Sequence, residues 1–209
     1  DSMLTALARA CERAFTQAGV PVEAQKPSRF HCTLLYLDGA TDEQVDEMFA
    51  GLSLPLVFHL EGVGVERLGE ALVLRLAPDP ALLRLQRDLW VRSKRVGATQ
   101  NEQGFSEPDG YKPHISLLAK VPDGVTLEGF EPPVGCRPPF HLNTSRIVLG
   151  REDYKRVRTI ALPATAGDRL FVEKGGPWAW PVPTLTVVRT VVGRDELATM
   201  LSHQPAVRS

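Results

Sequence analysis

Two short segments of the chain repeat each other, and each carries a histidine followed by a hydroxyl residue. Residues 29–35 align with residues 112–118, and both read cation, any residue, His, any residue, Thr or Ser, Leu, Leu. Side chains alternate between the two faces of a strand, so the cation, the imidazole and the hydroxyl of each segment share one face. These side chains are Arg29, His31 and Thr33 in the first segment and Lys112, His114 and Ser116 in the second.

Two imidazoles that face each other across a cleft suit the cleavage of a phosphodiester. A neutral histidine takes the proton from a water or hydroxyl nucleophile, and a protonated histidine gives a proton to the leaving oxygen. Thr and Ser hydroxyls can donate hydrogen bonds to the non-bridging phosphate oxygens, and a nearby cation offsets the charge that develops there. This chemistry requires no metal ion or other cofactor, and we expect none. The residues expected to be catalytic are His31, Thr33, His114 and Ser116; which histidine is the base stays open.

Four further residues near the repeat are candidate substrate contacts, beside the cations Arg29 and Lys112. Tyr36 and Tyr111 flank the motifs and can either stack on a nucleobase or pack internally with a satisfied hydroxyl. Phe105 lies in a polar loop over residues 97–110, and loops of this length are commonly functional. Lys120 follows the second motif, and strand parity places it on the face of His114.

At these motifs the chain resembles the 2H phosphoesterase superfamily, which includes the 2'-5' RNA ligase-like proteins and whose members carry two His-x-Thr/Ser motifs on strands of a bilobal fold. Residues 31–34 and 111–117 carry the resemblance, which extends over roughly residues 1–163. It implies a metal-independent phosphodiesterase that acts on 2',3'-cyclic phosphates, 2'-5' linkages or cyclic (oligo)nucleotides, with RNA end processing as one setting. Some RNA-directed members place an arginine soon after the second motif, whereas Lys120 is the nearest cation here.

Three other functions remain as alternatives. One is a catalytically quiet nucleotide-binding module of the same fold, against which the presence of all four motif residues argues. Another is a phage-type nuclease that destroys cyclic oligonucleotide immune signals. The last is a two-histidine metal hydrolase, which is disfavoured because no carboxylate accompanies either histidine on its strand face.

The elements that must position the two motifs follow from periodicity and turn signals. Apolar residues at helical spacing predict a first helix that Gly19 ends, and Thr41 and Asp79 mark the starts of two more. Helices are expected over residues 3–18, 41–50, 79–96 and 195–202, and strands over 30–37, 55–65, 71–77, 111–120, 138–149, 153–163 and 184–192.

This mixed order favours an α+β fold with two mainly antiparallel sheets and flanking helices. The histidines lie about 80 residues apart, roughly one small lobe, so we expect a bilobal, pseudo-symmetric arrangement around a central cleft. Residues 1–165 would form the 2H phosphoesterase-like domain, and residues 166–209 a C-terminal extension of unknown role.

Composition narrows the partners of the chain. Its 209 residues hold 24 Lys and Arg against 25 Asp and Glu, so no strong overall field attracts duplex DNA. The three cysteines are far apart, which is typical of a reducing compartment, and no apolar run is long enough to cross a bilayer. We therefore expect a cytoplasmic protein with a nucleotide or RNA-end substrate and no membrane partner; its oligomeric state is left open.

Overall fold

The fold is taken from a computed structural model of the chain. It describes residues 3–52, 58–100, 107–125, 130–132, 134, 136–144, 147–151, 156–160 and 184–190. Phe105 and the predicted helix over residues 195–202 lie outside these ranges. The described elements combine helices with two sheets, which confirms the predicted α+β class.

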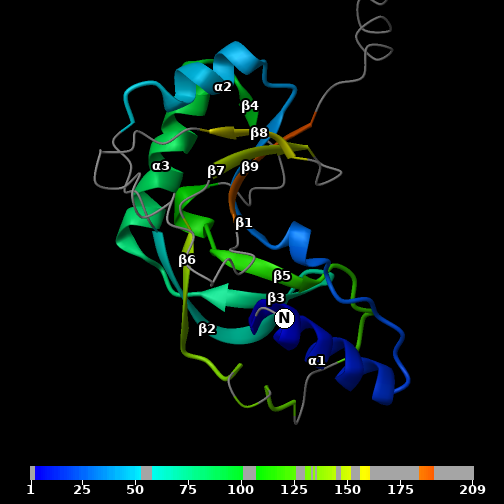
Figure 1. Ribbon diagram of the computed structural model, residues 1–209. Coiled ribbons are helices and arrows are strands. Elements are labelled where there is room, and N and C mark those ends of the chain that lie inside the picture. The colour runs from blue at the N-terminus through cyan, green and yellow to red at the C-terminus, as the bar shows by residue number, and fades with distance from the viewer. Residues whose placement is uncertain are drawn as a thin grey trace, which may run out of the picture.

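The first sheet has four strands in the order β5-β3-β2-β6, and all its pairings are antiparallel (Figure 1). A tight turn joins β2 to β3, and Gly69 adopts a φ of 58° there, which a glycine accepts without steric cost. The strands of this sheet are β2 (Phe58–Leu68), β3 (Ala71–Leu76), β5 (His114–Leu118) and β6 (Phe140–Thr144).

The second sheet has five strands in the order β4-β1-β9-β7-β8. Here β1 pairs antiparallel with β4, and β7 with β8, but β9 runs parallel to both of its neighbours, β1 and β7. The prediction of mainly antiparallel sheets therefore holds for the first sheet, while the second is mixed. The strands of this sheet are β1 (His31–Asp38), β4 (Thr99–Gln100), β7 (Ile147–Arg151), β8 (Arg156–Ile160) and β9 (Thr184–Thr190).

One predicted strand, over residues 138–149, is wrong because the chain changes sheets within it. Its first half is β6 at the edge of the four-stranded sheet, and its second half is β7 in the five-stranded sheet. The first half alternates and the second begins with an apolar run, and both patterns are compatible with a strand, so the local pattern does not reveal the change of sheet between them. The short strand β4 was likewise not expected, since it falls in the predicted polar loop.

The helix α1 (Met3–Gln17) follows the predicted apolar period, and α2 (Asp42–Phe49) and α3 (Pro80–Arg95) begin where their caps predict. Thr41 and Gln44 form a capping box at the start of α2. The carboxylate of Asp79 accepts hydrogen bonds from the first backbone N–H groups of α3, whose first residue is proline. No helix in the described part of the chain has the length and apolar composition that a membrane crossing requires.

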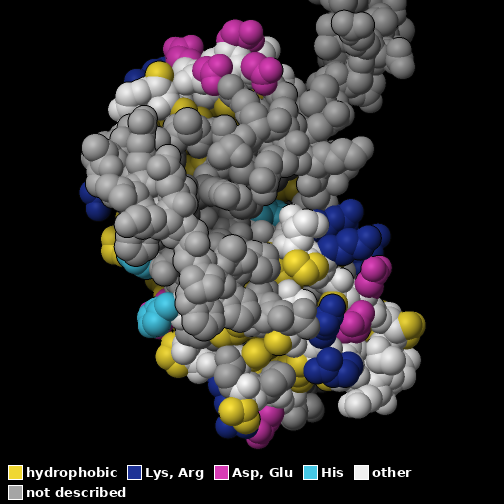
Figure 2. Space-filling model, viewed as in Figure 1, with side chains coloured by type: hydrophobic (Ala, Val, Ile, Leu, Met, Phe, Trp, Pro, Cys, Tyr) yellow, Lys and Arg dark blue, Asp and Glu magenta, His cyan; other side chains and the backbone are white. Residues whose placement is uncertain are grey.

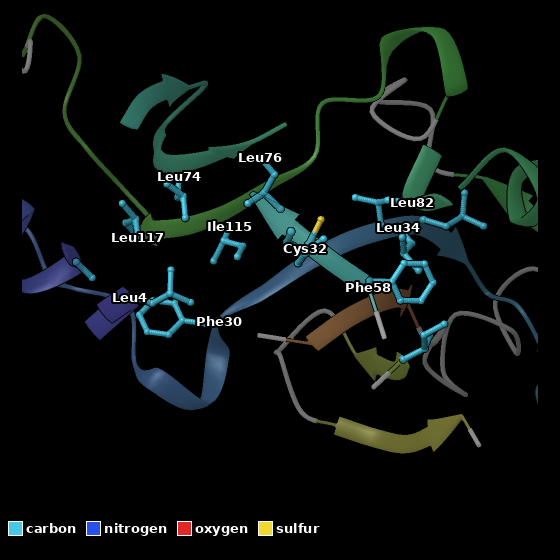
Figure 3. Close-up of a cluster of buried hydrophobic side chains, with 14 of the residues drawn as sticks. Leu4, Phe30, Cys32, Leu34, Phe58, Leu74, Leu76, Leu82, Ile115 and Leu117 are labelled. Carbon is cyan, nitrogen blue, oxygen red and sulfur yellow. The ribbon is translucent and has the colours of Figure 1, made fainter. Parts of the chain in front are cut away.

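A single cluster of buried apolar side chains runs through both sheets. On α1, Leu4 lies near Leu74, Ile115 and Leu117 of the four-stranded sheet, and farther along the cluster Leu34 of β1 lies near Leu82 of α3 (Figure 3). The apolar face of the four-stranded sheet therefore packs on α1. Its opposite face is the one that carries the second motif.

The strand β9 belongs to the region that the sequence assigns to a C-terminal extension. It lies in the middle of the five-stranded sheet, where its residues Thr184–Thr190 pair with β1 from His31 to Asp38. The boundary after residue 165 remains a prediction, but this part of the extension completes the sheet that holds the first motif.

We expect the removal of β9 to destabilise the protein strongly, because it leaves β1 and β7 without their shared neighbour. A chain ending at residue 183 should unfold about 10 °C or more below the parent, as measured by thermal unfolding, or should fail to remain soluble. A chain ending at residue 190 keeps β9 and is the matched control. Equal destabilisation of both truncated chains would contradict a specific role for β9.

Candidate active site

The two motif strands begin in the same way, directly after a single 3-10 turn. The turns are η1 (Pro27–Arg29) and η2 (Pro108–Gly110), and each has a proline at its first position. The backbone N–H of Phe30 donates to the carbonyl of Pro27, and that of Tyr111 donates to Pro108. These turns were not predicted, although proline at the first position of a helical turn is a recognised signal.

Both motif strands also contain an irregularity immediately after the hydroxyl residue. The pairing of β1 with β9 shifts between Thr33 and Leu35, so Leu34 is an extra residue in β1. The pairing of β5 with β3 shifts between Ser116 and Leu118, which makes Leu117 the extra residue in β5. A β-bulge of this kind changes which face the following side chains occupy.

The bulges explain the burial of the motif residues. In each strand the histidine and the hydroxyl residue are half-buried, the residue between them is buried, and two buried leucines follow. After the bulge in β1, Tyr36 returns to the half-buried face of His31 and Thr33, where simple alternation would not place it. The structure thus brings each predicted imidazole and hydroxyl onto one face of its strand.

Each motif imidazole is held by the carbonyl two residues before it. The Nδ1 atom of His31 lies 2.6 Å from the carbonyl oxygen of Arg29, and Nδ1 of His114 lies 2.7 Å from that of Lys112. A carbonyl oxygen only accepts hydrogen bonds, so Nδ1 carries the proton in both rings. In both rings Nε2 is therefore the atom at which a proton can be gained or lost.

The two histidines are close enough to influence each other electrostatically. The pKa of His31 lies below its ordinary value of 6.5, chiefly because burial disfavours the charged imidazolium. The hydrogen bond to the carbonyl of Arg29 opposes this shift, and the charge of His114 adds to it. His31 and His114 therefore lie close to each other, although they belong to different sheets.

Tyr111 connects the two motif strands. Its hydroxyl donates a hydrogen bond of 3.0 Å to the carbonyl of Thr33 and lies 3.4 Å from Sγ of Cys32. The Cys32 thiol also interacts with the backbone N–H of His114. Burial raises the pKa of Tyr111 well above its usual range and that of Cys32 to about 11, so both groups stay neutral.

For Tyr111 this geometry is the internally packed arrangement that was one of the two predicted alternatives. Its hydroxyl is directed to the first motif rather than to solvent. Stacking of either tyrosine on a nucleobase remains a prediction, as does the role of Phe105.

The predicted cations Arg29, Lys112 and Lys120 are all exposed. Figure 2 shows Lys and Arg side chains gathered over η1, whereas Asp and Glu side chains gather over α2. On this face of the molecule, a group of cations therefore lies near the first motif.

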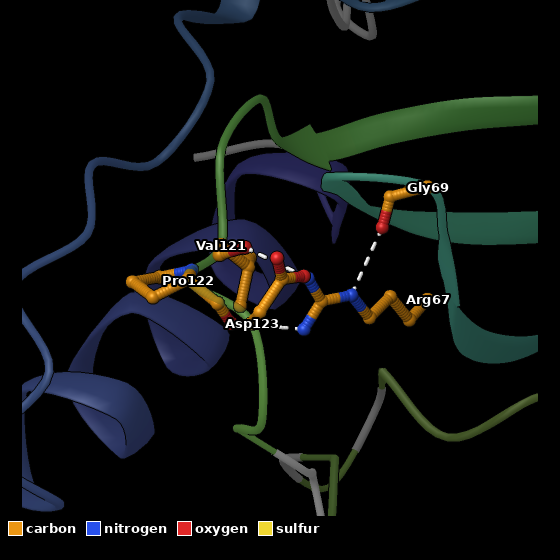
Figure 4. Close-up of polar contacts among 5 residues, drawn as sticks. All are labelled: Arg67, Gly69, Val121, Pro122 and Asp123. Atoms are coloured by element: carbon orange, nitrogen blue, oxygen red, sulfur yellow. Dashed lines mark hydrogen bonds and ion pairs between the residues drawn. The ribbon is translucent and has the colours of Figure 1, made fainter.

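Lys120 lies in a loop beyond the end of β5, so strand parity does not decide where its side chain points. Arg67 of β2 fixes the residues that follow this lysine (Figure 4). Its guanidinium donates to the carbonyls of Val121 and Pro122 and forms an ion pair of 2.6 Å with Asp123. A fourth hydrogen bond, to the carbonyl of Gly69, ties the loop to the β2–β3 turn.

Arg75 is a neighbour of the second motif that the sequence analysis missed. It lies on β3 directly opposite His114 in the antiparallel pairing, and such partners project from the same face of a sheet. No local pattern marks Arg75, because its place depends on the register of two strands that are far apart in the sequence. Within the described residues, no group of three or more His, Cys, Asp or Glu side chains is arranged to hold a metal ion.

Comparisons with known proteins identify two similar solved structures. No protein-family model and no curated protein matches the chain. Escherichia coli LigT complexed with 3'-AMP shares 20% identity with a TM-score of 0.48, over 76% of this chain and 93% of that chain. A structure described as a phosphoesterase shares 18% identity with a TM-score of 0.38, over 76% of this chain and 90% of that chain.

Proposed function

We propose that the protein is a metal-independent phosphodiesterase in which His31 and His114 act as base and acid. The observation that carries this proposal is the matching construction of the two motifs. Each imidazole is fixed through Nδ1 by the carbonyl two residues earlier, and each has a hydroxyl residue two positions later on the same face. If each histidine only stabilised its own strand, there would be no reason for both to have the same hydrogen bond and the same neighbouring hydroxyl residue.

The lowered pKa of His31 favours this residue as the base. A histidine with a pKa below 6.5 is mostly neutral at neutral pH, so its Nε2 can take the proton of an attacking water or ribose hydroxyl. As the new oxygen–phosphorus bond forms and the old one breaks, His114 gives the proton from its Nε2 to the leaving oxygen. Exchange with solvent then returns both histidines to their starting states.

The remaining motif residues have roles in holding the phosphate. The hydroxyls of Thr33 and Ser116 would donate to its non-bridging oxygens, whose charge grows in the transition state. The exposed cations Arg29, Lys112 and Lys120 would offset that charge from the rim. Tyr36 and Phe105 are candidate contacts for the nucleoside.

The substrates proposed for this site are 2',3'-cyclic phosphates, 2'-5' linkages and cyclic (oligo)nucleotides, with RNA ends among them. Each of these substrates would place one scissile phosphate between the two imidazoles. We also propose that the two motifs belong to two lobes related by pseudo-symmetry. The similar turns, bulges and imidazole anchors of β1 and β5 support this arrangement.

We expect hydrolysis of at least one of these substrates in the presence of EDTA. The panel consists of 2',3'-cyclic AMP, 2'-5' oligoadenylate, and cyclic di- and trinucleotides. Loss of activity on addition of EDTA would contradict metal independence. Nucleotide binding without turnover would identify a binding module instead, and turnover restricted to cyclic oligonucleotides would favour destruction of signalling molecules over RNA end processing.

His31→Ala and His114→Ala should each lower kcat by about 10²- to 10⁴-fold, the range typical of acid and base groups. His59 is an exposed histidine on β2 outside the motifs, and His59→Ala is the matched control that should keep the parental rate. Activity within about tenfold of the parent in either motif variant would contradict the acid/base assignment.

The pH dependence of His31 tests its proximity to His114. Replacing His114 with Gln removes the charge that disfavours protonation of His31, so the pKa of His31 should rise. It should remain below 6.5, because burial is the larger cause of the shift. The His31 resonance can be titrated by NMR in both proteins, and an unchanged or lower pKa in the variant would show that the rings do not interact.

Tyr111→Phe should lower both stability and catalytic rate. The variant leaves the buried carbonyl of Thr33 without its donor, a loss of about 1–3 kcal/mol in the free energy of unfolding. Because the hydroxyl joins the two motif strands, we expect kcat to fall about tenfold while KM changes little. Lower stability with an unchanged kcat would mean that Tyr111 does not position the catalytic groups.

A further inference from the structure

A row of three residues crosses the four-stranded sheet beside the second motif. Gly64 of β2, Arg75 of β3 and His114 of β5 are register partners, so they occupy neighbouring positions on one face of the sheet. This is the face opposite α1. A residue on β3 therefore stands next to a proposed catalytic histidine, one strand farther from the first motif.

The guanidinium of Arg75 is oriented by one partner. Its Nη1 lies 3.2 Å and 3.3 Å from the two carboxylate oxygens of Glu66 on β2. Both oxygens thus contact the same nitrogen. Among the described residues, the edge formed by Nε and Nη2 has no further partner, and the side chain is 44% exposed.

This open edge has the shape that recognises an oxyanion. Two parallel N–H groups of a guanidinium match two oxygens of a phosphate, and the pairing is stronger and more directional than that of a lysine. Gly64 contributes no side chain on this face, and no described atom lies within 4 Å of the place where a Cβ would stand. A ligand group can therefore approach Arg75 from the side of Gly64.

The position of Arg75 separates it from the phosphate between the two histidines. Its side chain is drawn toward Glu66 on β2, whereas the reacting phosphate would lie on the other side, between β5 and β1. Neighbouring strands are about 4.8 Å apart, so the backbone of Arg75 lies one strand spacing from that of His114, and the contact with Glu66 draws the guanidinium toward β2. A group that binds there is a different part of the substrate.

We propose that Arg75 binds a second phosphate of the substrate, on the His114 side of the site. This proposal rests on the proposed phosphodiesterase function and narrows its substrate class. The preferred substrate carries an additional phosphate beside the scissile one, as an oligonucleotide or a 5'-phosphorylated nucleotide does, and is not a simple mononucleoside cyclic phosphate. Glu66 offsets part of the charge of Arg75, so recognition depends on the paired hydrogen bonds as well as on charge.

Two substrates that differ by one phosphate test this inference. These are 2',3'-cyclic AMP and the same nucleotide with a 5'-phosphate. The parent protein should turn over the 5'-phosphorylated substrate with a kcat/KM about tenfold or more above that of the other, the size expected for hydrogen bonds to a charged group. Arg75→Met should abolish this preference, so that kcat/KM for the 5'-phosphorylated substrate falls about tenfold more than kcat/KM for 2',3'-cyclic AMP.

The matched control is Arg13→Met. Arg13 is an exposed arginine of α1, which packs on the opposite face of the same sheet, so this variant changes the net charge equally. It should keep the preference. A preference that survives Arg75→Met, or equal losses on both substrates, would overturn the assignment while leaving the phosphodiesterase function intact.

Calorimetric binding of adenosine 3'-phosphate and adenosine 3',5'-bisphosphate separates this inference from the proposed function. The proposed function fails only if the protein hydrolyses none of the substrates of the wider panel, whereas this binding measurement needs no turnover. Tighter binding of the bisphosphate that depends on Arg75 would still support the phosphate subsite, and equal binding by the parent and Arg75→Met would overturn it.

Glu66→Gln distinguishes a binding role of Arg75 from a purely structural role of the ion pair. The glutamine keeps an acceptor for Nη1 and removes a negative charge, so affinity for the bisphosphate should be equal to or higher than that of the parent. A loss as large as that in Arg75→Met would mean that the intact ion pair shapes the sheet, and would overturn the phosphate subsite.

Discussion

The hydrogen bond from Tyr111 to the carbonyl of Thr33 is the contact on which the geometry of the site depends. It joins the segment before β5, an edge strand of one sheet, to β1 in the other sheet. A half-buried phenol therefore ties the two motif segments directly to each other. Burial raises the pKa of this phenol well above its usual range, so the hydroxyl keeps the proton that it donates to the carbonyl.

The two motif strands reach this contact with similar local structures. Each follows a 3-10 turn, anchors its imidazole on the carbonyl two residues earlier, and contains an extra leucine after the hydroxyl residue. The bulge buries two successive leucines while it leaves the histidine and the hydroxyl half-buried. The five residues of each motif, from the histidine to the second leucine, thus supply both apolar side chains to the core and polar side chains to the half-buried face.

Local signals predicted most of the elements and the motif residues. The apolar period of α1, the capping box at Thr41 and the cap at Asp79 act over a few residues, and the helices begin there as expected. Strand alternation likewise placed His31 and His114 on strands, and the repeat indicated that they act together. These features depend on neighbours in the sequence, which is why they can be recognised without the fold.

Features that depend on pairing between distant segments could not be predicted. The insertion of β9 between β1 and β7, and the position of Arg75 beside His114, are consequences of register. The predicted orientation of Lys120 also depended on the fold. Strand parity applies only while the strand continues, and β5 ends at Leu118. A one-residue bulge also reverses parity, and it moved Tyr36 to the face of the first motif.

Burial keeps the ionisable groups in the interior of the site neutral. It lowers the pKa of His31 and raises the pKa values of Cys32 and Tyr111, and all three shifts favour the neutral form at neutral pH. The buried part of the site therefore carries little charge of its own. On the proposed function, charge enters with the substrate, and an anionic phosphate beside the two rings favours protonation of an imidazole. Substrate binding would thus help to create the protonated histidine that the leaving oxygen needs.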